Sequence, residues 1–315
     1  MESILILVLL SASGFMCVAI GASSIAAVFG PVASGGKIGV MRSALLAGIA
    51  AMLGAVFQGR KVTETIGIGI LEEGLGVGHA LIVLLIAASL VIASTLTDHP
   101  MPTAFTVVGS IIGVGLGSGI IVRWSTVNMM LLYWLLIPIL GFLLGYILYI
   151  PVKGITPSNE NDDGLRHIVL VGGLLMAFMA GANSVGRAIG PLMALDIDIV
   201  YLLIFGGVGI MMGCWFLSPR VINAISFDYS SIGPRRSISA LATAILLTQV
   251  GNSIGVPVAF VQVIITAIIG SGMAAGTTNI SRKKTVMTAL GWLSAFILAV
   301  SIAFVIGSLM TNYSS

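Results

Sequence analysis

The chain has 315 residues, of which 58% are hydrophobic and only 8% are charged, and its net charge is +3. Its mean hydropathy is +1.15. A soluble domain carries about 25% charged residues, because its surface must face water. The composition therefore predicts an all-α polytopic membrane protein, and it excludes nucleic-acid binders, cytosolic dehydrogenases and secreted disulfide scaffolds.

Apolar segments recur along the whole chain, and most are long enough to cross about 30 Å of hydrocarbon. The first begins near residue 3 and lacks the basic start of a signal peptide, having Glu2 instead, so we expect a retained helix. The predicted segments are 3–20 with a continuation to about 33, 41–58, 79–96, 100–122, 127–150, 167–193, 199–217, 237–250, 255–275 and 285–308.

The hydrophilic stretch PVKGITPSNENDDGLR divides the chain into an N-terminal transmembrane repeat (1–150), a linker (151–166) and a C-terminal transmembrane repeat (167–315). The two halves resemble each other in three places, in the same order and at nearly constant offset. The matches are GASSIAAVFGPV (21–32) with GANSVGRAIGPL (181–192), GAVFQGRKVTETI (54–66) with GCWFLSPRVINAI (213–225), and HPMPTAFTVVGSIIGVG (99–115) with VPVAFVQVIITAIIGSG (256–272). These matches indicate an internal duplication.

The basic residues indicate the orientation of the chain. If the Gly/Pro-interrupted pairs 79–122 and 237–275 fold as re-entrant hairpins, ten basic residues share one side with the linker, and only Arg60, Lys61 and Arg123 lie opposite. This bias predicts a cytoplasmic linker, both termini outside and two halves of inverted topology in the plasma membrane. Inverted repeats with broken helices are typical of secondary transporters, which bind substrate between the repeats near the midplane. The ten residues are Lys37, Arg42, Lys153, Arg166, Arg220, Arg235, Arg236, Arg282, Lys283 and Lys284.

Small and polar residues interrupt the apolar helices at the two copies of the first motif. A break in the backbone would expose N–H groups and the positive end of a half-helix, which suits an anion. The alternative is close packing of helices through small residues, which is common in membranes. Because the motif occurs in both halves, we favour an anion site. The candidate residues are Gly21, Ala22, Ser23, Ser24, Gly181, Ala182, Asn183 and Ser184.

The same motif resembles the G-A-N-D-V-A-N-A-x-G-P signature of the inorganic phosphate transporter (PiT) family. RKVTETI (60–66) resembles that family's K-V-x-E-T-I, and segments 98–117 and 255–272 resemble its P-x-S-T-T-H hairpins. The resemblance extends over nearly the whole chain. It implies an inverted-repeat secondary transporter, commonly a homodimer, that carries phosphate with sodium or protons.

This chain departs from the family pattern where charge matters most. Ser23-Ser24 and Asn183-Ser184 replace the two Asn-Asp pairs, so both aspartates are absent. Monohydrogen phosphate needs an acceptor for its proton, whereas sulfate has acceptor oxygens only and would be repelled by a carboxylate. The departures therefore favour sulfate over phosphate or another oxyanion such as molybdate, and protons over sodium as the coupling ion.

Arg187 stands where the family has a later asparagine. A charged side chain at the centre of a bilayer is costly, so it has a partner or a function. One interpretation is a salt bridge to a buried acid, with Glu64 as the candidate. The other is a guanidinium that binds the oxyanion through two hydrogen bonds. Both hold if Glu64 pairs with Arg187 until substrate arrives.

Other polar residues lie at or near the predicted hairpin breaks. Asp98 and His99 are candidates, with Glu64, for carrying the coupled proton, although they are also suited to capping a helix at the membrane edge. Polar side chains that could line the site, or form hydrogen bonds between helices, are Thr103, Asn252, Ser253 and Gln262.

Taken together, the sequence predicts a proton-coupled secondary transporter of sulfate, with a phosphate transporter as the alternative and a passive anion channel as a further one. An intramembrane enzyme is disfavoured because no set of nucleophile and base stands out. No cofactor, metal or nucleic-acid partner is predicted. Cys17 and Cys214 lie in apolar runs and are interpreted as packing residues.

Overall fold

The computed structural model describes residues 2–25, 28–29, 32, 39–96, 102–156, 162–217, 233–276 and 282–314. Across these residues the regular secondary structure is helical, and the segments between helices contain one antiparallel bridge, between Leu71 and Val122. This agrees with the all-α membrane class that the composition predicts.

The helices follow the predicted apolar segments closely. The first half contains α1 (Glu2–Ile20), the π-helical turn η1 (Gly21–Ile25), α3 (Val40–Gln58), α4 (Arg60–Glu64), the π-helical turn η2 (Thr65–Gly69), α5 (Val77–Leu96), α6 (Thr103–Gly117) and α7 (Trp124–Ile155). The second half contains α8 (Asp163–Ile189), the 3₁₀ turn η3 (Gly190–Leu195), α9 (Ile199–Phe216), α11 (Pro234–Ile254), α12 (Phe260–Ala274) and α13 (Arg282–Ser314).

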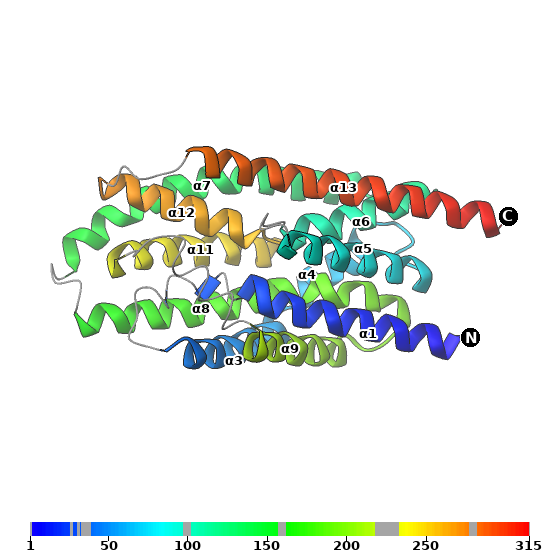
Figure 1. The fold of residues 1–315 in the computed structure, drawn as a ribbon, viewed down its shortest axis with the longest axis horizontal. Helices are drawn as coiled ribbons and strands as arrows, with labels where there is room; N and C mark the ends of the chain where they lie inside the picture. Colours follow the sequence, from blue (N-terminus) through cyan, green and yellow to red (C-terminus); the bar gives the residue numbers. More distant parts are fainter. Residues whose placement is uncertain are drawn as a thin grey trace.

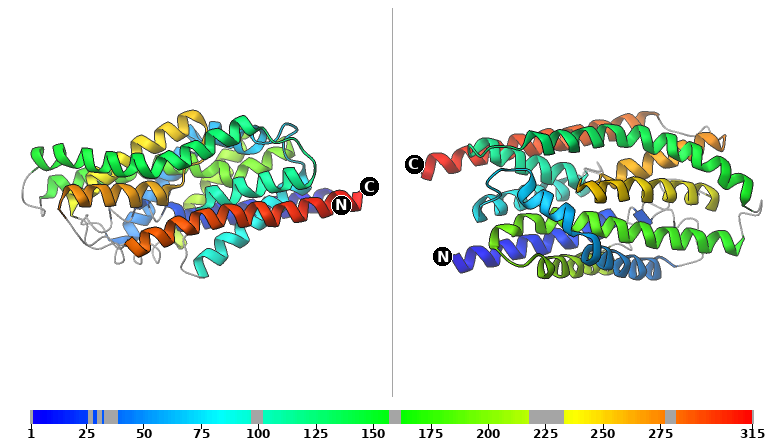
Figure 2. Two further views of the ribbon diagram at one scale, coloured as in Figure 1. Left: turned by 90° about the horizontal axis from the view of Figure 1, so that it is seen from above. Right: turned by 180° about the vertical axis from the view of Figure 1, so that it is seen from behind.

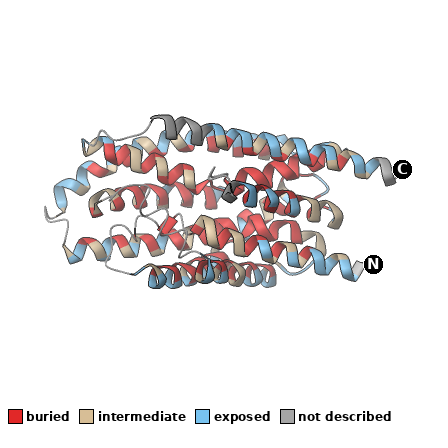
Figure 3. Ribbon diagram, in the orientation of Figure 1, coloured by how far each residue is buried: buried red, intermediate tan, exposed pale blue. Residues whose placement is uncertain are grey.

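Within the described residues, 7 helices are long and apolar enough to cross a membrane. Their outward faces carry large apolar side chains such as Leu135 on α7 and Phe216 on α9, which are 68% and 72% exposed. Figure 3 shows the buried residues gathered on the inward faces of the helices. Exposed apolar surface of this extent is suited to lipid contact, because lipid is the solvent that such side chains prefer.

Two pairs of helices reach the middle of the molecule from opposite ends. In Figure 1 α5 and α6 lie in the half that carries both chain termini, and α11 and α12 lie in the other half. The view from behind in Figure 2 shows the same arrangement. The first residues of α6 and α12 therefore lie near the centre, as expected for two hairpins that each enter and leave at their own end.

Glycines let helices of one half pack closely on helices of the other. A Cβ on Gly181 in α8 would lie 2.0 Å from the backbone oxygen of Ala51 in α3, and one on Gly21 would lie 2.1 Å from that of Ile210 in α9. Gly21 and Gly181 are equivalent in the aligned motif, and Ala51 and Ile210 stand equally far before the second pair of aligned segments. Each motif glycine thus packs on the corresponding helix of the other half.

The hairpins also pack on helices of the opposite half through glycines. A Cβ on Gly113 in α6 would lie 2.3 Å from the backbone oxygen of Val300 in α13, and one on Gly270 in α12 would lie 2.1 Å from that of Phe142 in α7. Gly113 and Gly270 are equivalent in the aligned hairpins. The long helices α7 and α13 therefore each hold the hairpin of the opposite half, and this fixes where the two hairpin tips meet.

The backbone at the second copy of the motif differs from the prediction. We expected a break at Gly181, but α8 continues without interruption to Ile189, and the helix tightens only at η3. The N–H groups near Gly181 therefore lie inside a helix and are not the free N–H groups of a helix end. The glycine at this position instead allows a neighbouring helix to pack closely. At the first copy the helix widens into the π-helical turn η1, a feature often found at functional sites.

Candidate functional site

Three polar residues of the second motif are buried in the wall of the helical core. Asn183 and Ser184 have no exposed surface, and Arg187 is 1% exposed. All three lie on α8, which passes the place where the hairpin tips meet. A guanidinium at this depth requires compensation for its lost hydration.

Arg187 is held by side chains from three elements, α6, α8 and α12. Its Nη1 donates to Thr103 Oγ1 over 2.6 Å, and its Nη2 donates to Ser184 Oγ. Its Cζ lies 5.1 Å from the centre of the Phe260 ring. Nε is buried and has no hydrogen-bond partner among the described residues. The guanidinium is therefore positioned by neutral groups and keeps a donor available.

Thr103 and Phe260 are the first residues of α6 and α12. The N-cap residues of these helices, Pro102 and Ala259, supply no capping side-chain hydrogen bond. The N-terminus of a helix carries roughly half a positive charge on its free N–H groups. Two such ends and the Arg187 guanidinium together form a strongly electropositive site.

Asn183 binds the tip of the second hairpin rather than facing an empty space. Its Nδ2 donates to Asn252 Oδ1 over 2.7 Å and to the Val256 oxygen over 2.9 Å, and its Oδ1 accepts from the Val258 N–H over 2.6 Å. Asn252 Nδ2 in turn donates to the Met179 oxygen over 3.1 Å. The two predicted binding residues Asn183 and Asn252 thus fix the tip that carries Phe260.

The first motif packs against α9 and also contacts α1 and α8. Gly21 is buried there, and Ala22, Ser23 and Ser24 are half-buried. Ser23 Oγ donates to the oxygen of Ala19 in its own helix over 2.8 Å. Among the described residues, no recorded hydrogen bond joins Ser23 or Ser24 to Arg187. Ala182, the remaining residue of the predicted set, is fully buried.

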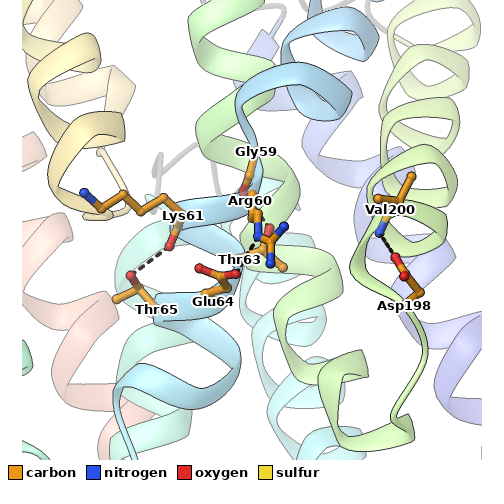
Figure 4. A network of polar contacts seen from close by, with 8 residues as sticks. All are labelled: Gly59, Arg60, Lys61, Thr63, Glu64, Thr65, Asp198 and Val200. Atoms are coloured by element: carbon orange, nitrogen blue, oxygen red, sulfur yellow. Dashed lines mark hydrogen bonds and ion pairs between the residues drawn. The ribbon is translucent and has the colours of Figure 1, made fainter.

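Glu64 does not pair with Arg187. It accepts a hydrogen bond from Arg60 Nε over 2.7 Å within α4, where the two side chains are 38% and 69% exposed (Figure 4). The predicted Glu64–Arg187 ion pair is therefore wrong, because Arg60 stands one helical turn before Glu64 and satisfies it locally. Asp98 and His99 lie outside the described residues.

The hairpin residues Ser253 and Gln262 have different surroundings. Ser253 is exposed, and its carbonyl accepts a hydrogen bond from Lys61 Nζ. Gln262 is buried, and its Oε1 has no partner among the described residues. Lys61 and Phe260 were missed as site residues. The family resemblance covered both segments, K-V-x-E-T-I for Lys61 and the P-x-S-T-T-H hairpin at 255–272 for Phe260, but it indicated a role for neither residue.

Comparisons with known proteins agree with this architecture. The sequence profile of the phosphate transporter family matches the chain twice, over residues 20–165 and 156–303. The sulfate permease CysP of Bacillus subtilis is 30% identical over 305 residues, which cover 94% of this chain and 85% of the permease. A solved structure named "The sodium-dependent phosphate transporter" superposes with a TM-score of 0.86 at 20% identity, over 98% of this chain and 99% of that one.

The chain is thus a multi-pass membrane protein with the fold of a transporter, built from two copies of one sequence unit. It belongs to the phosphate transporter family, and the resemblance seen in the sequence is confirmed.

Proposed function

We propose that this protein is a secondary active transporter of an inorganic tetrahedral oxyanion, that the oxyanion is sulfate, and that proton movement drives its uptake. The observation that carries the proposal is the buried Arg187 guanidinium between the N-termini of α6 and α12. Its described hydrogen-bond partners, Thr103 and Ser184, are neutral.

Energetics favour an anion as the missing partner of Arg187. A charged side chain at the bilayer centre costs about 2.5–3.5 kcal/mol on insertion scales. The hydroxyl groups of Thr103 and Ser184 accept hydrogen bonds from the Arg187 guanidinium, but they are neutral and leave its positive charge uncompensated. A doubly charged oxyanion would neutralise it and could accept hydrogen bonds from the guanidinium and from the uncapped N–H groups of both helices.

The chemistry of the wall favours sulfate. Ser184 and Asn183 stand where the family signature has a carboxylate and its neighbour, and Ser184 is hydrogen-bonded to Arg187. A site without a carboxylate suits an anion that has only acceptor oxygens. The likeness to a protein named as a sulfate permease over 94% of the chain supports the same substrate.

A phosphate transporter coupled to sodium or protons is the second candidate. The description of the family and the name of the similar solved structure favour it. Monohydrogen phosphate would have to donate its proton to Thr103 or Ser184, the neutral hydroxyl groups beside Arg187.

We further propose that the repeats 1–150 and 167–315 are inverted in the plasma membrane, with the linker 151–166 in the cytoplasm and the protein acting as a homodimer. The exchanged glycine contacts and the approach of the two hairpins from opposite ends support the inversion. Alternating access would then move the hairpin of one repeat relative to α8, exposing Arg187 to one side at a time. No covalent chemistry is involved, in line with the transport functions named for its relatives.

Uptake into proteoliposomes tests the proposal. We expect radiolabelled sulfate to enter saturably when a proton gradient is imposed, with phosphate entering more slowly and sodium having little effect. Sodium-driven phosphate uptake would establish the second candidate instead. Flux that ignores both gradients and does not saturate would indicate a passive channel.

A further inference from the structure

Lys61 extends from α4 to the tip of the second hairpin. Its ammonium donates to the carbonyl of Ser253, which lies in the last turn of α11, and its side chain is exposed. Figure 4 shows the side chain directed away from Arg60 and Glu64 and toward the neighbouring helix. Within the described residues, the Lys61 ammonium therefore donates to a neutral carbonyl and not to a carboxylate.

The position of this ammonium in the membrane implies water around it. Figure 1 places α4 near the middle of the length of the molecule, at the level of the hairpin tips, and not at the outer surface to which the predicted orientation assigned Arg60 and Lys61. Arg60 and Glu64 on the same short helix are also partly exposed. Exposed charges at this depth avoid lipid and instead face a water-filled cavity. The exposed surface of α4 and the end of α11, here called the mouth, therefore favours contact with water over contact with lipid.

Of the charged residues on α4, Lys61 is the cation without a carboxylate partner among the described residues. Arg60 is paired with Glu64 over 2.7 Å, so these two charges offset each other. The carbonyl of Ser253 offers only the weak negative end of the α11 dipole. A doubly charged anion is a better partner for an ammonium than a carbonyl, because a hydrogen bond between two ions is stronger.

The same tip is also held by residues of the proposed substrate site. Asn183 binds Val256 and Val258, and Arg187 stacks on Phe260. Lys61 on α4 and Arg187 on α8 thus contact the same tip, which spans fewer than ten residues. An anion that reaches Lys61 is therefore close to the tip that borders Arg187.

We propose that Lys61 is the first binding residue for the transported oxyanion: its ammonium exchanges the Ser253 carbonyl for the anion at the mouth, from which the anion moves to Arg187. The inference rests on the proposed function and adds an outer binding subsite to it. Because Lys61 also holds the hairpin tip, release of Ser253 by the anion would free the tip to move when substrate is present.

The test replaces the ammonium and then restores it chemically. In Lys61→Cys the new thiol is exposed, whereas the native Cys17 and Cys214 are fully buried. We expect the KM for sulfate to rise about tenfold with a smaller change in kcat, as for loss of a contact used in binding. Modification with aminoethyl methanethiosulfonate should return KM to within about twofold of wild type, and the neutral methyl reagent should not. Sulfate should also slow the modification in detergent.

Lys153→Met is the control for charge loss, since it removes an exposed cation near the end of α7. It should leave KM unchanged. A KM for Lys61→Cys equal to that of wild type, or equal recovery with the aminoethyl and methyl reagents, would overturn the role of the Lys61 charge. Failure of wild type to transport any oxyanion would overturn the proposed function itself, so the two failures are distinguishable.

Discussion

Arg187 and Thr103 are 84 residues apart in the sequence, yet the guanidinium Nη1 donates to the threonine Oγ1 over 2.6 Å inside the protein. The bond joins α8 of the second half to the first residue of α6 in the first half. It places the buried cation at the end of one hairpin, while the ring of Phe260 brings the end of the other hairpin to the same guanidinium. This geometry, and the packing around it, can be tested by substitution.

Replacing Arg187 with alanine should abolish sulfate uptake, because the site loses the only charge that the described residues direct into it. Arg187→Lys should also be severely impaired, since an ammonium lacks the planar fork that binds two oxygens at once. Uptake into proteoliposomes measures both variants, and elution as a single peak in detergent checks that they are folded. Near-normal uptake by Arg187→Ala would remove this residue from the site.

Thr103→Val should raise the KM for sulfate by roughly tenfold while the protein remains folded. A hydrogen bond to a charged group contributes about 1.5–3 kcal/mol, and its loss leaves Nη1 free to turn away from the tips. Thr106→Val is a matched control, because Thr106 is also buried on α6 but donates only to the Thr103 carbonyl of its own helix over 3.1 Å. Equal KM values for the two variants would contradict a positioning role for Thr103.

Ser184→Asp should shift the preference of the protein from sulfate toward phosphate. The new carboxylate would stand beside Arg187, repel an anion with acceptor oxygens only and accept the proton of monohydrogen phosphate. Competition between the two labelled anions measures the shift, and Ser184→Asn serves as a neutral control of similar size. If the ratio of the two uptake rates stays the same in Ser184→Asp, the argument from the absent aspartates is wrong.

Gly181→Ala should destabilise the protein by more than about 2 kcal/mol, the range in which overpacking forces helices apart. The added Cβ would lie 2.0 Å from the Ala51 oxygen, so α3 and α8 would have to separate. Gly154→Ala is the control, because nothing lies within 4 Å of a Cβ at that position. Thermal unfolding in detergent compares the two, and a similar midpoint in both would show that the close approach of α3 and α8 is dispensable.

Part of the site could be predicted from the sequence, because one of its residues is unusual for a membrane-spanning segment. Arg187 is a cation inside an apolar run, and such a residue stands out whatever the fold. Its predicted partner could not be found in the same way. Glu64 was chosen because both residues belong to repeated motifs, but Arg60 satisfies it one helical turn away, and that local pairing decides the contact.

The backbone conformation of the two motif copies also depended on packing. GASSI (21–25) and GANSV (181–185) look alike, yet one forms a π-helical turn and the other continues an α-helix. The helix N-termini that lie near Arg187 are those of α6 and α12, not one at Gly181. Nothing in the local sequence distinguishes a glycine that ends a helix from one that admits a neighbouring backbone.

The amino-acid sequence by itself determined that the protein lies in a membrane, that its halves are duplicated, that it belongs to its family and that Arg187 is exceptional. These features follow from composition, repeated motifs and the cost of burying charge, which are properties of single segments. Only the tertiary structure decided that Thr103 and Phe260 meet at Arg187, that Asn183 and Asn252 hold a hairpin tip and that Lys61 reaches Ser253. Those contacts join residues 69 to 192 positions apart, and their geometry depends on how helices of one half pack on glycines of the other.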